Sequence, residues 1–195
     1  MQNAHIQCTS IDKNPLWLAP QALADFLTMQ ETFGELQGQT LTYVGDGNNV
    51  AHSLMLCGAL LGVNVRVACP DGFEPLPGVL DQARSLAVAG AEISVSSDPA
   101  AAVSGAQVIY TDVWASMGQE QEQLERQQAF QGFCVNEALL AQADSRAIVL
   151  HCLPAHRGEE ISAEVMEGSA SRIFDQAENR LHAQQALLAA LLGGL

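Results

Sequence analysis

Three short polar stretches stand where apolar runs of the sequence end. They are GDGNN at 45–49, TD at 111–112 and HC at 151–152, and each follows a run typical of a buried strand. The carboxyl ends of parallel strands meet at one edge of a sheet, and ligands bind there where the strand order reverses. We therefore expect the carboxylate, the thiol and the carboxamides of these stretches to converge on a small polar ligand.

Cys152 admits three interpretations. A nucleophilic cysteine needs a base, but His151 is its neighbour in the predicted strand, and adjacent strand residues point to opposite faces. A metal ligand needs further ligands, and no second cysteine or His-x-x-His motif lies close by in the sequence. We favour a polar pocket wall that forms hydrogen bonds, although packing alone would also account for a buried cysteine.

Asp112 is followed by Ser116 and Met117. The carboxylate is either solvated, or caps the next helix, or binds a ligand. Together with a hydroxyl and a carboxamide it suits a zwitterion, because the carboxylate takes the ammonium group while the others bond the ligand's own carboxylate and amine. Asn48 and Asn49 supply carboxamides, and we expect one to cap the following helix and the other to face the ligand.

The pair Gly45-x-Gly47 also invites a dinucleotide-binding interpretation. The match is weak, because Val50 stands where the fingerprint requires a third glycine and Asp46 would repel a pyrophosphate. A tight turn before a capped helix explains the same residues.

Arg180 is the candidate anion ligand. It falls in the first turn of a helix predicted at 178–192, where the helix dipole disfavours a cation unless an anion binds beside it. The alternative is that Arg180 pairs with Glu178 or Asp175.

The order of the predicted elements indicates an α/β fold. Strands are predicted at 41–44, 63–68, 91–95, 107–113 and 147–152, with a sixth at 172–174. Helices are predicted at 22–33, 50–61, 78–89, 120–130, 137–143, 162–167 and 178–192, with a short one after Asp98. This alternation favours a doubly wound, mainly parallel sheet with helices on both faces. We divide the chain into an irregular arm (1–20), an α/β domain (21–177) and a closing helix (178–195).

Composition argues against several classes of function. The 195 residues include 22 acidic and 8 basic ones, for a formal net charge of −14, which is unsuited to nucleic acid or an anionic membrane. Five cysteines without a C-x-x-C pair argue against a disulfide framework and a structural zinc site. We recognise no signal peptide and no apolar run of about 18 residues, so we expect a cytoplasmic protein.

Four stretches together resemble the second half of ornithine carbamoyltransferases. They are VGDGNNVAHS at 44–53, TDVWASMGQE at 111–120, HCLPAHRGEE at 151–160 and FDQAENRLHAQ at 174–184. The resemblance runs from about 21 to 192. It implies the fold of that family and transfer of a carbamoyl group from carbamoyl phosphate to the δ-amine of L-ornithine, giving citrulline and phosphate. It implies no cofactor and no metal, and family members are homo-oligomers, namely trimers.

The resemblance also implies a role for each site residue. The residues that would bind L-ornithine are Asn49, with Asn48 as second choice, Asp112, Ser116 and Met117. Those that would contact carbamoyl phosphate are Gln21, Cys152, Leu153 and Arg180. Asp112 and Cys152 would be catalytic, with Cys152 orienting the substrates rather than forming an acyl-enzyme. The attacking amine must lose a proton and be aimed, which requires a carboxylate and positioning more than a covalent catalyst.

The sequence departs from the family pattern in its N-terminal part. Family members begin with a carbamoyl-phosphate domain that carries a Ser-Thr-Arg-Thr-Arg loop, and no such segment occurs here. Their His-Pro-x-Gln corresponds to Leu-Ala-Pro-Gln at 18–21, which keeps only the glutamine. Charge-assisted hydrogen bonds contribute about 1.5–3 kcal/mol each, so losing three or four lowers affinity or rate by roughly 10³- to 10⁷-fold.

We therefore retain other functions as alternatives to the transferase. The first is a non-catalytic ornithine-binding domain, or a half that needs a partner chain for carbamoyl phosphate. A nucleotide-binding oxidoreductase and an aspartate-accepting relative are further alternatives, and SMGQE and HCLP argue against the latter. The closing helix has an apolar face of leucines that is either exposed or buried by self-association.

Overall fold

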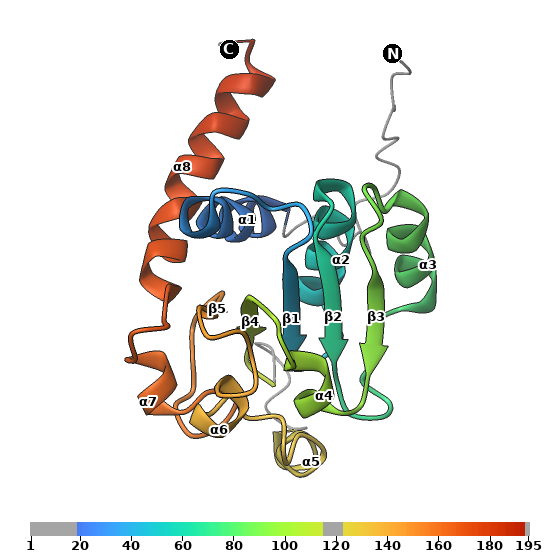
Figure 1. The fold of residues 1–195 in the computed structure, drawn as a ribbon, viewed down its shortest axis with the longest axis vertical. Helices are drawn as coiled ribbons and strands as arrows, with labels where there is room; N and C mark the ends of the chain where they lie inside the picture. Colours follow the sequence, from blue (N-terminus) through green and yellow to red (C-terminus); the bar gives the residue numbers. More distant parts are fainter. Residues whose placement is uncertain (1–18, 115–122, 194–195) are drawn as a thin grey trace.

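The computed structural model describes residues 19–114 and 123–193. Within them a single sheet of five parallel strands has the order β3-β2-β1-β4-β5 (Figure 1). The strands are β1 (Thr40–Val44), β2 (Asn64–Ala68), β3 (Ile93–Ser96), β4 (Val108–Thr111) and β5 (Ile148–His151). The chain moves outward from β1 to β3 and then returns to place β4 against the other side of β1. The strand order therefore reverses between β1 and β4.

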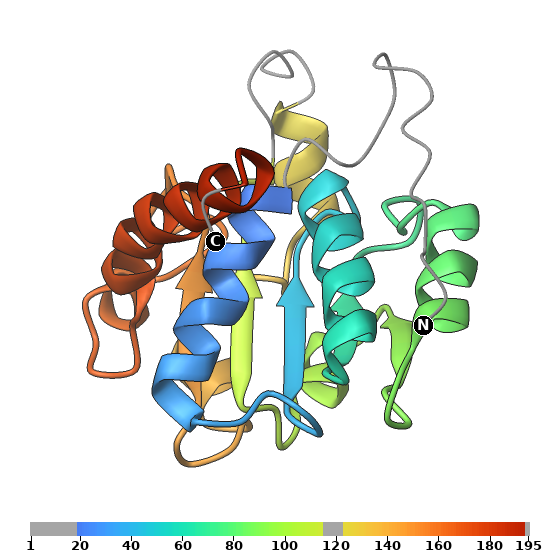
Figure 2. The ribbon, with the colours of Figure 1, turned by 90° about the horizontal axis from the view of Figure 1, so that it is seen from above.

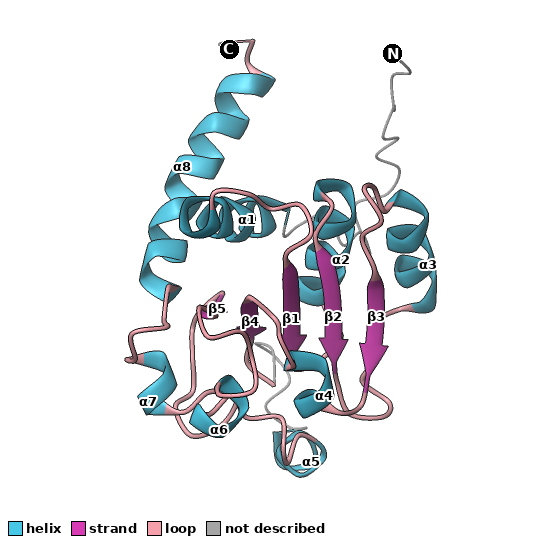
Figure 3. Ribbon diagram, in the orientation of Figure 1, coloured by secondary structure: helices cyan, strands magenta, loops and turns pink. Residues whose placement is uncertain are grey.

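Helices alternate with the strands, as Figure 3 shows. They are α1 (Ala19–Phe33), α2 (Asn49–Leu61), α3 (Pro77–Leu86), α4 (Pro99–Val103), α5 (Gln123–Ala129), α6 (Glu137–Leu140), α7 (Ala163–Met166) and α8 (Ile173–Leu191). No helix in the described ranges is both long enough and apolar enough to cross a membrane.

Each face of the sheet has its own hydrophobic core. On one face α1, α2 and α3 pack with side chains such as Phe26, Leu54 and Ala83 against the strands. On the other face α4, α6 and α7 supply Val103, Leu139 and further apolar side chains. Figure 2 shows α1 and α2 side by side over one face of the sheet. The predicted doubly wound architecture with helices on both faces is confirmed.

The helix that begins the site is defined at both ends by its sequence. The side-chain oxygen of Asn48 accepts a hydrogen bond from the N–H of Val50, which caps the N-terminus of α2. Gly62 ends the helix with φ 75°, in the left-handed conformation that glycine adopts without steric cost. The Asn48 cap fixes where the β1–α2 loop ends, and Gly62 fixes where the chain turns toward β2.

The end of the chain differs from the prediction in two ways. The prediction of a sixth strand at 172–174 is wrong, because α8 already begins at Ile173 and Ser171 before it forms only an isolated bridge with Val149. The helix is also continuous across 177–178, where we placed a boundary. Its cap residue, Arg172, makes no side-chain capping bond. The start therefore lacks the Ser, Thr, Asp or Asn that marks a helix N-terminus in a sequence.

Helix α8 packs along α1 and then extends past it (Figure 1). Its contact with α1 includes hydrogen bonds from Asn179 Nδ2 to Thr28 Oγ1 (3.0 Å) and to Glu31 Oε2 (2.7 Å). In the predicted apolar face of α8, Leu187 is partly buried. The other members of that face, Leu181, Leu188 and Leu191, are exposed.

Candidate functional site

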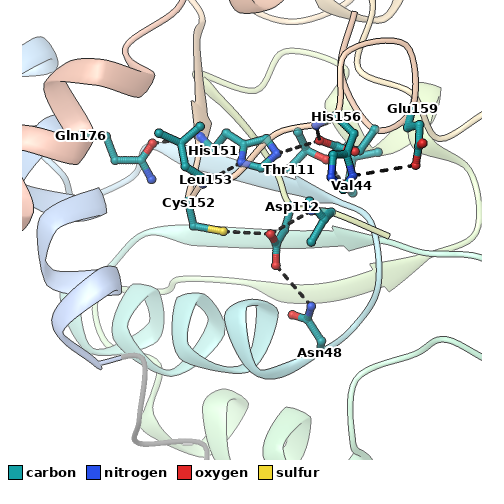
Figure 4. A network of polar contacts seen from close by, with 12 residues as sticks. Val44, Asn48, Thr111, Asp112, His151, Cys152, Leu153, His156, Glu159 and Gln176 are labelled. Atoms are coloured by element: carbon teal, nitrogen blue, oxygen red, sulfur yellow. Dashed lines mark hydrogen bonds and ion pairs between the residues drawn. The ribbon is translucent and has the colours of Figure 1, made fainter. Parts of the chain in front are cut away.

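The predicted convergence of strand ends takes place around Asp112, which follows β4 and is 7% exposed. Its Oδ1 accepts hydrogen bonds from the Cys152 thiol, at 3.0 Å, and from the N–H of Val113, at 2.8 Å. Its Oδ2 lies 3.4 Å from the donor Nδ2 of Asn48 (Figure 4). The carboxylate thus joins the loops after β1, β4 and β5, at the point where the strand order reverses.

The Cys152 side chain is a thiol donor in this arrangement. Burial, followed by the negative charge of Asp112, raises the pKa of the Cys152 thiol well above its ordinary value. A nucleophilic cysteine requires the opposite shift, from a cation or a helix N-terminus. The geometry therefore favours the hydrogen-bonding pocket wall over the nucleophile.

The two asparagines after β1 divide their roles largely as expected. Asn48 caps α2 with its oxygen and donates its amide hydrogen toward Asp112. Asn49 is the first residue of α2, and its side chain is exposed at the same edge. Asn49 is therefore the member of the pair that is open to a ligand, while Asn48 orients the carboxylate.

The glycines before them serve contact between two loops. A Cβ at Gly47 would lie 2.3 Å from the backbone nitrogen of Pro75, and the Gly47 N–H donates to the carbonyl of Phe73 at 2.8 Å. The β2–α3 loop thus occupies the space beside Gly47. In a dinucleotide fingerprint the glycine backbone approaches a pyrophosphate instead, so this contact argues against that alternative.

Asp46 is paired with Arg126 of α5. The Arg126 Nη1 lies 2.6 Å from Asp46 Oδ2 and also donates to the carbonyl of Trp114 at 2.8 Å, while its guanidinium stands 5.1 Å from the ring centre of Phe73. Burial raises the pKa of Asp46, and the hydrogen bond and charge of Arg126 counter that rise. One cation therefore ties together the loops after β1, β2 and β4.

His151 supports the segment that follows β5. The N–H of Leu153 donates to His151 Nδ1 at 2.9 Å, so the ring hydrogen is on Nε2, which faces Glu160 Oε1 at 3.1 Å. Both side chains are fully buried. Leu153 has φ 58°, a conformation that costs energy for a residue with a Cβ, and the bond to His151 helps to hold it there. His151 therefore orients the segment at 152–153 and is not the base for Cys152.

Asp112, His151 and Cys152 also offer potential metal-ligand atoms within 4.8 Å of one another. The Cys152 thiol is bonded to Asp112, and both ring nitrogens of His151 face other partners. A metal ion would have to displace those hydrogen bonds. The expectation that the site needs no metal stays a prediction.

The residues expected at carbamoyl phosphate are less completely assembled. Leu153 adjoins Cys152, but Gln21 lies on α1, where its Nε2 donates to Asp25 Oδ1 at 2.7 Å. Arg180 is not in the first turn of a helix, because α8 begins about two turns earlier, and its side chain is exposed. Its expected partner Asp175 lies 3.9 Å from Arg172 instead.

Ser116 and Met117 lie outside the described residues. Among the described residues, sequence reasoning missed Arg126, Glu160, Asp25 and Gln176. Glu160 is part of the HCLPAHRGEE stretch and Gln176 is part of FDQAENRLHAQ, and these stretches were the only available signal for them. Arg126 and Asp25 depend on contacts between distant segments.

Comparisons with known proteins show which family this chain resembles. Residues 37–191 match the family model "Aspartate/ornithine carbamoyltransferase, Asp/Orn binding domain". Ornithine carbamoyltransferase of Parasynechococcus marenigrum is 79% identical over 175 residues, covering 90% of this chain and 55% of that protein. The corresponding protein of Thermosynechococcus vestitus is 62% identical over 172 residues, covering 88% and 56%.

Solved structures give the same result. Ornithine carbamoyltransferase from Pyrococcus furiosus has a TM-score of 0.87 at 50% identity, covering 91% of this chain and 57% of that one. The enzyme from Gloeobacter violaceus has a TM-score of 0.82 at 54% identity, covering 89% and 58%. The chain spans about half the length of the curated relatives it matches. It belongs to the aspartate/ornithine carbamoyltransferase family.

Proposed function

We propose that the chain provides the ornithine side of a carbamoyltransferase site, in which the δ-amine of L-ornithine attacks the carbonyl carbon of carbamoyl phosphate. The observation that carries this proposal is the hydrogen-bonded group of Asn48, Asp112 and Cys152 at the reversal of strand order. It is supported by the match to a model of the Asp/Orn-binding domain and by the names of the relatives.

Each side chain has a part in that reaction. Asp112 presents a carboxylate to an ammonium group of ornithine, Asn49 a carboxamide to its carboxylate, and the 115–122 segment contributes Ser116 and Met117. The neutral δ-amine forms the new C–N bond while the C–O bond to phosphate breaks, and the proton that the nitrogen loses passes to the departing phosphate. Cys152 and Leu153 lie between the two substrates and aim them, which lowers the barrier by positioning. The raised pKa of the Cys152 thiol fits this role, because a neutral thiol donates a hydrogen bond and does not attack.

A second candidate function is an ornithine-binding half without independent turnover. It is favoured by the small number of cations among the residues proposed to bind the phosphate group. The residues proposed for carbamoyl phosphate in this chain are Gln21, Cys152, Leu153 and Arg180, and only one of them is a cation. Binding of a phosphate commonly uses several cations or helix N-termini. In this alternative a partner chain supplies the remaining contacts.

Citrulline formation by the purified 195-residue chain separates the two candidates. It is measured with saturating L-ornithine and carbamoyl phosphate, with Asp112→Asn as the control. Citrulline well above that control supports turnover by this chain or its oligomer. Ornithine binding by calorimetry without citrulline formation supports the binding half. If the chain shows no ornithine binding and forms no citrulline, both candidates are contradicted.

The same proposal includes self-association. The exposed leucines of α8 form an apolar surface that water contacts in the single chain. We expect light scattering to give a molar mass above that of one chain. A strictly monomeric chain at micromolar concentration would remove this part of the proposal.

A further inference from the structure

Asp25 of α1 is a fully buried carboxylate outside the strand-end loops. Its Oδ1 accepts two hydrogen bonds, from Gln21 Nε2 at 2.7 Å and from Gln176 Nε2 at 2.6 Å. Its Oδ2 has no hydrogen-bond partner among the described residues. Burying a carboxyl group with one oxygen unpaired costs free energy in either protonation state, and joining two helices alone does not require it.

Gln176 carries the contact onward to the site. Its Oε1 accepts the main-chain N–H of His151 at 2.9 Å, while its Nε2 reaches both Asp25 and the Tyr110 hydroxyl (3.2 Å). His151 is the last residue of β5, and Cys152 follows it directly. Figure 4 shows Gln176 beside His151 at the end of the strand. The bond to Asp25 fixes the orientation of the Gln176 carboxamide, which in turn fixes the strand end.

Gln21, which is proposed to contact carbamoyl phosphate, bonds the same carboxyl group. It is 4% exposed, and one hydrogen of its Nε2 points to Asp25. A primary amide has a second hydrogen and an oxygen, and these stay available to a ligand. The bond to Asp25 therefore fixes the direction in which the second Nε2 hydrogen and the Oε1 of Gln21 point.

We propose that Asp25 is a positioning residue that holds two parts of the site in register, fixing the Gln21 amide directly and the His151–Cys152 strand end through Gln176. This inference rests on the proposed function, which assigns Gln21 and Cys152 to contacts with carbamoyl phosphate. Asp25 itself touches no substrate.

A matched control is available one turn along α1. Thr28 is buried at the same contact between α1 and α8, where its hydroxyl accepts from Asn179 Nδ2 at 3.0 Å. Thr28→Val removes that helix-to-helix bond and leaves Gln21, Gln176 and His151 untouched. Asp25→Leu removes the acceptor from both glutamines. Asp25→Asn keeps one oxygen that can accept both bonds, and so tests rescue by a conservative change.

The first readout is hydrogen exchange of the His151 amide in the full chain, referred to the Val149 amide, whose acceptor is the Ala170 carbonyl. The second is the Kd for L-ornithine. For Asp25→Leu we expect the exchange rate of the His151 amide, relative to that of Val149, to rise roughly tenfold, and the Kd for L-ornithine to rise by a similar factor, as loss of one orienting hydrogen bond implies. We expect both quantities to stay near the wild-type values in Asp25→Asn and in Thr28→Val.

The inference is overturned if Asp25→Leu alters His151 exchange and the Kd no more than Thr28→Val does at equal loss of stability. Should Asp25→Leu not fold, Gln176→Met decides the question, because it removes the bond to His151 with little change in volume. If the wild type binds no ornithine, the proposed function fails. In that case the exchange ratio alone supports or overturns the coupling of Asp25 to the strand end.

Discussion

The thiol of Cys152 donates a hydrogen bond to Asp112 Oδ1 across 3.0 Å, joining the carboxyl ends of the neighbouring strands β4 and β5. Forty positions separate the two residues in the sequence. The bond keeps the carboxylate aimed at the edge of the sheet, where Asn48 approaches its other oxygen. It also means that the sulfur is a donor to this carboxylate, so the two side chains act as one unit.

Asp112→Asn is expected to abolish measurable ornithine binding without unfolding the chain. The substitution keeps the size of the side chain and removes the charge that an ammonium group needs. It also turns one acceptor into a donor facing Asn48 or Cys152. Charge-assisted bonds of about 1.5–3 kcal/mol correspond to losses of roughly 10- to 150-fold each. Titration calorimetry measures the Kd, and Asp71→Asn, an exposed acid on the β2–α3 loop, is the control for general charge effects.

Wild-type affinity in the Asp112→Asn variant would contradict the assignment of this site to ornithine. An equal loss in Asp71→Asn would point to long-range electrostatics instead, given the net charge of −14.

Cys152→Ser is expected to weaken binding or turnover without eliminating either. Serine keeps a donor toward Asp112 but is smaller and less polarisable, so orientation suffers while no covalent step is lost. Because burial raises the pKa of the Cys152 thiol, its alkylation by iodoacetamide should also be slow at pH 7 and accelerate only in strongly alkaline solution. Peptide mapping by mass spectrometry gives the rate for this cysteine. Complete inactivity of Cys152→Ser, together with a covalent adduct trapped on Cys152 in the wild type, would show that Cys152 acts as a nucleophile.

The expectation that polar residues at the carboxyl ends of parallel strands converge predicted the central group of the candidate site from the sequence. Asn48, Asp112 and Cys152 each follow an apolar run, and the reversal of strand order brings all three together. The helix cap at Asn48 was equally predictable, because a capping asparagine bonds a neighbouring N–H and needs no knowledge of the tertiary fold. Local chemistry and the topology of parallel sheets were sufficient for these residues.

The contacts made by α8 were not predictable in this way. The helix starts without a capping side chain, so the sequence offered no signal at 172–173, and Arg180 was assigned to the wrong turn. Gln176 and Asp25 are 151 positions apart, and polar residues in helices are ordinarily expected on solvated faces. Only the packing of α8 on α1 shows that these two are buried partners.

We expect titration of Asp25 to contribute to the pH dependence of the free energy of unfolding. Burial, the largest influence, raises the pKa of its carboxyl from 3.8 to about 7, against the hydrogen bonds from Gln21 and Gln176, the nearby Tyr110 hydroxyl and the charge of Arg180. Between these two pH values the folded state keeps a proton that the unfolded chain has lost. The stabilising contribution is therefore fully present below the unfolded pKa and is lost as the pH rises through about 7.

In Asp25→Asn this contribution to the pH dependence disappears. The variant should gain stability relative to the wild type between pH 5 and pH 8, by an amount on the order of a few kcal/mol. Urea denaturation at both pH values measures the difference in unfolding free energy. Parallel pH profiles for the two proteins would show that Asp25 keeps an ordinary pKa in the folded chain.

Arg126→Met should destabilise the chain by about 2–4 kcal/mol, because it leaves the carboxylate of Asp46 without its cation in a largely dry environment. The side chains of this pair are 10% and 16% exposed, and the arginine also bonds the Trp114 carbonyl, so little water can replace it.

The matched control is Arg157→Met, since Arg157 and Glu167 form an ion pair at the same 2.6 Å with side chains 49% and 57% exposed. Exposed pairs contribute about 0–1 kcal/mol. Chemical denaturation of both variants gives the two values. The double variant Asp46→Asn with Arg126→Met should recover part of the loss, because the stranded charge is gone. Equal effects in the two single variants would mean that the Asp46–Arg126 pair is as well solvated as a surface contact and does not tie the loops of the site together.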